Sequence, residues 1–193
     1  MIAYLTGNFS YKSPAMVYID INGVGYEVNI SLNTYSAIQD LDNGTLFTYL
    51  QIKEDGHTLF GFVNMAEKTM FLQLIGISGV GASTARMMLS SLKPEDIIRA
   101  IQMGQTSVLE SIKGIGKKTA ERIILELKDK LGKNDVNHAT NSLKNNTLEL
   151  DALNALMALG ISRPQAEAAL RKVSATDSTL NLEQLIKKSL QAI

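Results

Sequence analysis

The stretch GIGKKTA at residues 114–120 repeats a pattern that the chain already carries as GVGASTA at residues 79–85. Gly79 and Gly114 stand 35 residues apart, and each turn lies between two apolar, helix-forming segments. A Gly-hydrophobic-Gly turn between helices brings unpaired backbone N–H groups to the start of the second helix, where the helix dipole also favours negative charge. Glycine allows positive φ and leaves the backbone bare, so that a phosphate can approach it. The pattern predicts two helix-hairpin-helix turns that bind nucleic-acid phosphates without reading sequence.

The side chains around the two turns differ. The second turn runs directly into Lys117 and Lys118, whereas the first runs into Ala82 and Ser83, so we expect the second turn to bind phosphate more strongly. One such turn is often only a tight connection between helices, but two in register rarely arise by chance. The candidate DNA contacts are Gly79, Val80, Gly81, Ser83, Thr84 and Arg86 at the first turn, and Gly114, Ile115, Gly116, Lys117, Lys118 and Arg122 at the second.

Composition excludes several kinds of chemistry. The 193 residues include no cysteine, which rules out disulfides, thiol catalysis and cysteine-ligated metals, and only two histidines, which rules out a multi-histidine metal site within one chain. We therefore expect no metal and no cofactor. No apolar run approaches the length of a membrane span, and the N-terminus lacks a basic segment followed by an apolar one. The expected location is the cytoplasm, without contact to a membrane.

The net charge of zero hides an uneven distribution along the chain. Residues 1–62 carry two basic and six acidic side chains, a net charge of −4, whereas residues 63–133 carry eleven basic and seven acidic side chains, a net charge of +4. The positive excess therefore coincides with the two predicted hairpins, where phosphate neutralisation needs it.

The chain divides into unlike parts, which together predict a multidomain α+β protein. Residues 1–63 are expected to form a small closed barrel of the OB type with five or six strands, and a small sandwich is the competing architecture. Four runs have strand character: 16–21, 26–30, 46–53 and 58–63. Asn22-Gly23 and Asp55-Gly56 are two-residue hairpin signals.

The remaining residues are expected to be helical apart from one linker. Residues 64–132 form the tandem helix-hairpin-helix domain, in which the last helix starts at Lys117 and ends near Gly132. Residues 133–147 contain five asparagines and few large apolar side chains, which predicts a flexible linker. Residues 148–193 have the pattern of a three-helix bundle, most simply a module that docks on another protein.

The order of these parts resembles the RuvA family, the DNA-binding subunits of the bacterial Holliday-junction branch-migration complex. The resemblance rests on GVGYEV at residues 23–28, on Glu54-Asp55 shortly before LFGF at 59–62, on the tandem turns with GIGKKTAER at 114–122, and on the C-terminal bundle. It implies a non-catalytic homotetramer that holds a four-way DNA junction open and flat in recombination and repair. It also implies a partner motor, the ATPase RuvB, and a RuvC-type junction resolvase is a further candidate partner.

The resemblance also implies roles for two other groups of residues. Glu54 and Asp55 would form an acidic pin, whose carboxylates repel phosphates near the centre of the junction; from the residues alone, Asp before Gly is ordinary turn chemistry. In the bundle, Leu156, Leu159 and Ile161 would form an exposed apolar patch for the motor, and core packing is the alternative for each. At the first turn, many members of the family carry Pro-Lys where this chain has Ala82-Ser83, so no lysine role transfers there.

Enzymatic alternatives fit the sequence less well. The segment around Gly116-Lys117 is not an ATP-binding P-loop, because position 111 is Ser and Lys118 occupies the place of Ser or Thr. A helix-hairpin-helix DNA glycosylase would need a catalytic aspartate, but Asp129 lies in a helix rich in Lys and Glu. A scaffold or processivity factor that binds plain duplex DNA is also compatible with the local sequence, and only the acidic pin and the C-terminal bundle argue against it.

Overall fold

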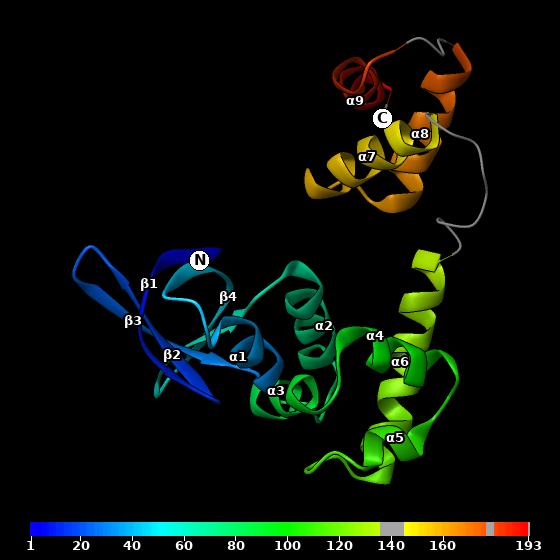
Figure 1. The fold of residues 1–193 in the computed structure, drawn as a ribbon. Helices are drawn as coiled ribbons and strands as arrows, with labels where there is room; N and C mark the ends of the chain where they lie inside the picture. The colour runs from blue at the N-terminus through cyan, green and yellow to red at the C-terminus, as the bar shows by residue number, and fades with distance from the viewer. Residues whose placement is uncertain (136–144, 177–179, 193) are drawn as a thin grey trace. The chain divides into compact units, whose positions relative to one another are not determined.

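The computed structural model describes residues 1–135, 145–176 and 180–192 (Figure 1). The chain forms two compact units, residues 1–136 and 137–193. We call them unit 1 and unit 2.

Unit 1 begins with a closed barrel of five strands in the order β1-β2-β3-β5-β4. β3 and β5 pair in parallel, and the other neighbouring strands are antiparallel. The barrel has the OB-type architecture that the sequence predicts, and its closure excludes the sandwich. The strands are β1 (Tyr4–Ser13), β2 (Met16–Ile21), β3 (Val24–Ile30), β4 (Asn43–Lys53) and β5 (Gly56–Phe62).

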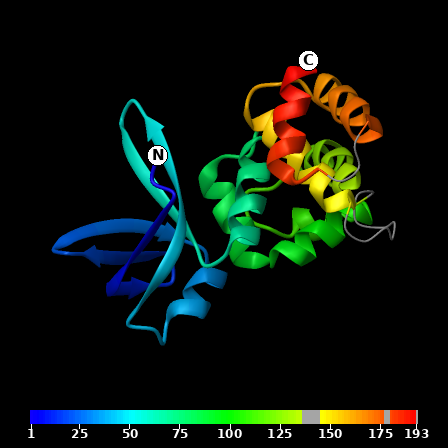
Figure 2. The ribbon, with the colours of Figure 1, turned by 90° about the horizontal axis from the view of Figure 1, so that it is seen from above.

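Alternating side chains fill the barrel. On β2, Val17 and Ile19 are fully buried and Tyr18 between them is exposed, as the two-residue period of a strand requires. Asn22 and Gly23 connect β2 to β3 with φ of 52° and 87°, values that a two-residue type I′ turn needs. Figure 2 shows that the hairpin of β4 and β5 reaches beyond the rest of the barrel.

Two elements of the barrel are absent from the four predicted runs. In β1 the register shifts between Phe9 and Tyr11, and this bulge interrupts the alternation that marks a strand in the sequence. Helix α1 (Leu32–Ile38) has only seven residues, too few to show a helical period. Its N-cap is Ser31, whose hydroxyl oxygen accepts the Thr34 N–H at 3.0 Å.

Helices form the rest of unit 1 and share one apolar core. This core runs from Phe60 and Phe62 on the barrel through Phe71 to Ile123 and Leu127 near the end of the unit. α6 continues three residues beyond Gly132, because one glycine costs a helix only about 1 kcal/mol relative to alanine and no proline follows it. The helices are α2 (Met65–Ile75), α3 (Ala82–Ser91), α4 (Pro94–Gln102), α5 (Thr106–Glu110) and α6 (Lys117–Asp135).

Unit 2 is a three-helix bundle of α7 (Asn145–Ala158), α8 (Arg163–Thr176) and α9 (Leu182–Gln191). Its core contains Leu153, Leu156, Leu170 and Leu185. Of the predicted linker at 133–147, the first three residues continue α6 and the last three begin α7; the others lie outside the described residues. In the described parts of both units, no helix is long and apolar enough to cross a membrane.

Candidate nucleic-acid interface

The two glycine turns have the same backbone geometry. Gly79 and Gly114 have φ of 93° and 91°, which favours glycine at both positions. At the first turn the Val80 N–H donates to the Ile77 carbonyl at 3.0 Å, and at the second the Ile115 N–H donates to the Ile112 carbonyl at 3.1 Å. The 35-residue repeat in the sequence is therefore a repeat in structure.

The central apolar residue of each turn anchors it to the core. Val80 and Ile115 are buried in the shared apolar cluster of unit 1. The N–H groups of Val80 and Ile115 already donate hydrogen bonds to carbonyls inside the turns. Both residues therefore fix the shape of the turns, and the amides without a partner inside the turns belong to the residues that follow them.

Those amides begin at the second glycine of each turn. The first hydrogen bond of the i→i−4 type joins Ala85 N–H to the Gly81 carbonyl in α3, at 2.9 Å, and Ala120 N–H to the Gly116 carbonyl in α6, at 3.0 Å. The four amides before each donor, at residues 81–84 and 116–119, have no acceptor within their own helix. Gly81 has no side-chain cap. Gly81, Ser83 and Gly116 are exposed, and each turn presents a ready site for an anion.

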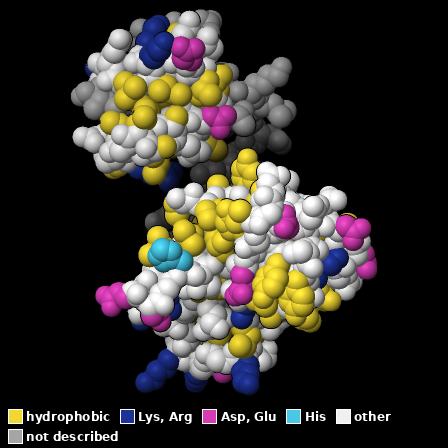
Figure 3. Space-filling view, turned by 90° about the vertical axis from the view of Figure 1, so that its left-hand side faces the viewer, with side chains coloured by type: hydrophobic (Ala, Val, Ile, Leu, Met, Phe, Trp, Pro, Cys, Tyr) yellow, Lys and Arg dark blue, Asp and Glu magenta, His cyan; other side chains and the backbone are white. Residues whose placement is uncertain are grey.

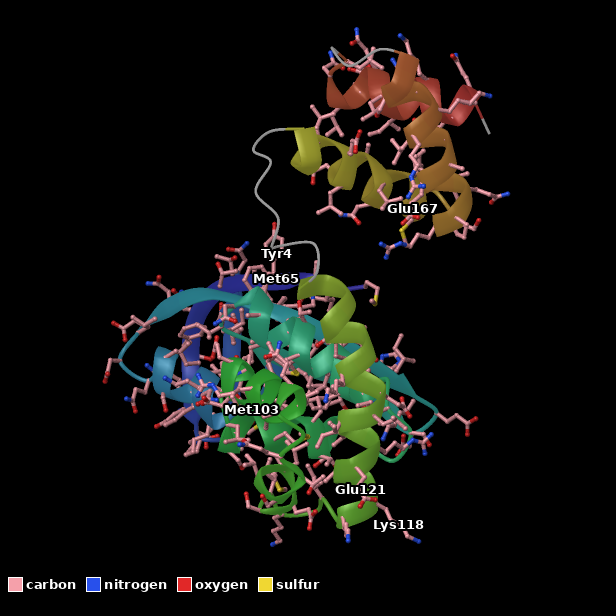
Figure 4. All side chains as sticks on the ribbon, turned by 90° about the vertical axis from the view of Figure 1, so that its right-hand side faces the viewer. Tyr4, Met65, Met103, Lys118, Glu121 and Glu167 are labelled. Carbon is pink, nitrogen blue, oxygen red and sulfur yellow. The ribbon has the colours of Figure 1, made fainter. Side chains whose placement is uncertain are left out.

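Basic side chains surround the second turn. Lys117 and Lys118 are exposed at the start of α6. Lys113 is also exposed just before Gly114, and the prediction from sequence missed it, although its position beside the turn signal could have indicated it. Figure 3 shows lysine and arginine side chains gathered at the lower end of unit 1, and Figure 4 places Lys118 at this end, next to Glu121.

Arg122 is held by an ion pair within α6. Its Nε lies 2.7 Å from Glu126 Oε1, one helical turn further on. Such exposed pairs contribute about 0–1 kcal/mol. A phosphate can therefore replace the Glu126 carboxylate at little cost.

The first turn has hydroxyl groups in place of lysines. Ser83 is exposed and Thr84 is half-buried at the beginning of α3. Arg86 faces the barrel: its Nη1 donates to the Asn29 side-chain oxygen at 2.6 Å and to the Ala15 carbonyl at 3.1 Å. Burial lowers the pKa of the Arg86 guanidinium from its ordinary value. In this position Arg86 connects two parts of unit 1, which the sequence did not predict.

Glu54 and Asp55 occupy the tip of the hairpin between β4 and β5. Lys53 pairs with Gly56, so the two turn residues are Glu54-Asp55 and not Asp55-Gly56 as the dipeptide signal predicted. Both carboxylates are exposed, and in the described part of the chain neither forms an ion pair. The tip therefore carries two carboxylates that no salt bridge among the described residues holds, with exposed Lys53 directly beside them.

The three apolar residues predicted as a patch in unit 2 do not lie together on the surface. Leu156 is fully buried among the core residues of the bundle, so its prediction as an exposed contact was wrong. Its place on the inner side of α7 makes it part of the packing that holds three short helices together. Ile161 is half-buried and packs against the same core, and Leu159 is 62% exposed.

Comparisons with known proteins agree with this architecture. Residues 1–61 match the family model described as RuvA N terminal domain, residues 71–129 match the SAM-like Helix-hairpin-helix tandem, and residues 147–193 match the RuvA, C-terminal domain. Three similar curated proteins are each named Holliday junction branch migration complex subunit RuvA.

Each of these relatives covers at least 99% of the chain. The protein of Flavobacterium psychrophilum is 47% identical over 192 residues, 99% of each chain. That of Christiangramia forsetii is 44% identical over 193 residues, 100% of each chain, and that of Cytophaga hutchinsonii is 42% identical over 197 aligned positions, 99% of each chain. The chain belongs to the RuvA family.

Proposed function

We propose that this chain is the subunit of a branch migration complex that binds four-way DNA junctions through the phosphate backbone. The observation that carries the proposal is the pair of turns with matching φ and matching hydrogen bonds, each followed by amides that lack an acceptor within their own helix. The names of the full-length relatives support a Holliday junction as the ligand and a branch migration complex as the assembly.

The two turns bind the two strands of one arm from the minor-groove side. Backbone amides at residues 81–84 and 116–119 meet the phosphates, assisted by the Ser83 and Thr84 hydroxyls at the first turn and by the lysines at the second. Lys113 is added to this set because it flanks the second turn. Contacts to the backbone carry no sequence information, so the arm can slide through the complex while equivalent phosphates replace one another at the turns.

The acidic tip shapes the junction. Negative charge within a surface that binds phosphates lowers affinity, so Glu54 and Asp55 make physical sense as a device that keeps strands apart at the crossover. Four copies in cyclic symmetry would bring four such tips to the centre and offer one pair of turns to each arm. A homotetramer of this kind matches the symmetry of an open, flat junction.

The chain has no catalytic role in this proposal. A RuvB-type ATPase supplies the work and docks on unit 2, where exposed Leu159 and half-buried Ile161 remain the candidate contacts. A RuvC-type resolvase would act on the junction that the tetramer presents. No cofactor enters the mechanism, and the complex would act in the cytoplasm, where bacterial DNA is found.

Competition between DNA structures tests the proposal. A labelled four-way junction is bound to the full chain and displaced by unlabelled junction or by linear duplex of equal length and composition. We expect the junction to compete at least about tenfold better than the duplex, which corresponds to about 1.4 kcal/mol. Equal competition would favour the alternative of a scaffold for plain duplex, and release of a base from lesion-bearing duplex would favour a glycosylase.

A further inference from the structure

A short polar segment at the end of the barrel forms hydrogen bonds to the helices of the first hairpin. Residues 29–34, Asn-Ile-Ser-Leu-Asn-Thr, run from the end of β3 into α1. Five of these six residues form hydrogen bonds to α2, to α3 or to the residue that follows α3. Ile30, the sixth, is buried in the barrel core. We call residues 29–34 the polar clamp.

The clamp holds α3 at three points along its length. Asn29 accepts from Arg86 Nη1 at 2.6 Å, and the Leu32 N–H donates to Ser90 Oγ at 3.1 Å. The Asn33 amide nitrogen donates to the Leu89 carbonyl at 2.6 Å and to the Leu92 carbonyl at 3.1 Å, which caps the end of α3. α3 is the helix whose first amides form the first phosphate site.

The clamp holds α2 through a buried carboxylate. Glu67 accepts from the Ser31 hydroxyl at one oxygen and from the Thr34 hydroxyl, at 2.5 Å, at the other. The Glu67 side chain is almost fully buried. A buried carboxylate is costly unless its oxygens keep their partners, so these bonds admit one arrangement of α1 against α2.

The hairpin that ends in the acidic tip packs on α2 at its base. Phe60 and Phe62 of β5 pack on Phe71 of α2, with ring centroids 5.2 and 4.9 Å apart. The opposite end of the β4–β5 hairpin is the turn with Glu54 and Asp55. Apolar contacts supply attraction without direction, whereas hydrogen bonds to fixed partners set an orientation.

We propose that the polar clamp fixes the acidic tip relative to the phosphate-binding turns, and that Arg86 is its positioning residue. This inference rests on the proposed function and assigns junction selectivity and phosphate affinity to different residues. The clamp controls where the tip stands, and the turn amides control how tightly an arm is bound. In this assignment Arg86 orients the first hairpin through Asn29 and Ala15 and is not one of the phosphate contacts.

A coupling experiment separates the two roles of Arg86. Arg86→Met removes the bonds to Asn29 and Ala15, and Arg99→Met is the control, because it removes an exposed arginine on α4 whose ion pair is with Asp96. In each background, junction and duplex affinities are measured with the native tip and with Glu54→Gln/Asp55→Asn. All proteins are full-length.

We expect the two arginine variants to bind duplex with affinities within about twofold of each other, because each has one positive charge fewer than the wild-type chain. Neutralising the tip should tighten junction binding in the wild-type and Arg99→Met backgrounds and have little effect in the Arg86→Met background. A full tip effect in Arg86→Met, or a selective loss of duplex affinity in that variant, would overturn the proposal.

A measurement without DNA distinguishes failure of this inference from failure of the proposed function. The chain has no cysteine, so His57→Cys near the tip and Lys113→Cys at the second turn provide unique sites for spin labels. With labelled chains diluted into unlabelled ones, the distance distribution should broaden in Arg86→Met and in Ser90→Ala but not in Arg99→Met. Equal widths in all variants would refute the clamp, whatever the DNA preference.

Discussion

Gly114 and Gly116 stand two residues apart in the same turn and serve different needs. Gly114 has φ of 91°, whereas Gly116 lies outside the positive-φ region, and an added Cβ would meet no atom within 4 Å at either position. The backbone therefore requires glycine only at Gly114. At Gly116 the backbone sets no such requirement, and we propose that the missing side chain lets a phosphate approach the bare amide.

This difference predicts two separable defects. Gly114→Ala should lower the free energy of unfolding by about 1–2 kcal/mol, because alanine is strained at positive φ. Gly116→Ala should leave stability nearly unchanged and still weaken DNA binding, because its methyl group obstructs the phosphate. Denaturant unfolding and junction binding of both variants provide the check, and unchanged binding by a stable Gly116→Ala would contradict the role of this amide.

Leu156 and Leu159 are leucines three residues apart in unit 2, of which the first is buried in the core and the second is exposed. Leu156→Ala should destabilise unit 2 by about 2–5 kcal/mol, since it leaves a cavity in a small core. Leu159→Ala should change stability little and reduce binding of the motor, because its side chain is mostly exposed. Thermal unfolding and motor pull-down separate these effects. Unchanged thermal stability of Leu156→Ala would contradict the burial of this side chain in the core of unit 2.

Ser189 is a buried polar residue in the last helix of unit 2. Its hydroxyl is buried in α9 without a hydrogen-bond partner among the described residues. Ser189→Ala should raise the stability of unit 2 by about 0.5–1 kcal/mol, because alanine has the higher helix propensity and buries no polar group. The midpoint of denaturant unfolding measures the change, and a lowered midpoint would show that the hydroxyl has a partner.

At the start of α6, we propose that lysine side chains assist the backbone amides in binding phosphate. Lys117→Ala/Lys118→Ala should weaken binding to all DNA sequences alike and reduce the slope of log K against log salt by about 0.9 for each phosphate that the variant no longer neutralises. Lys128→Ala is a suitable control, as it is exposed on the same helix about 16 Å further along. Salt titration of junction binding measures the slopes. Equal slopes for the double variant and the wild-type chain would place the phosphates elsewhere.

Elements with strong local signals were predictable from the sequence, whereas elements with an interrupted or very short period were not. The turns were predictable because glycine, an apolar anchor and a helix start are local signals, and both copies formed as expected. β1 and α1 were missed because a bulge and a seven-residue length erase their periods. The orientation of Arg86 and the burial of Leu156 depend on distant partners, which local sequence does not encode.

For the whole chain, we propose that DNA binding belongs to unit 1 and motor recruitment to unit 2. The boundary between the two units falls after residue 136, and unit 1 contains both turns and the acidic tip. Residues 1–136 alone should bind junctions with nearly the affinity of the full chain and fail to stimulate the motor. Junction binding and motor-driven branch migration, measured on the truncated and full chains, test this division, and loss of binding on truncation would contradict it.

The central claim is that backbone amides at two repeated turns contact the DNA. Hydrogen exchange read by mass spectrometry measures this most directly, on the full chain with and without four-way junction. The amides within residues 81–84 and 116–119 should exchange more slowly in the complex, and those of α8 should not change. Unchanged exchange at both turns, with protection confined to other surfaces, would contradict the account.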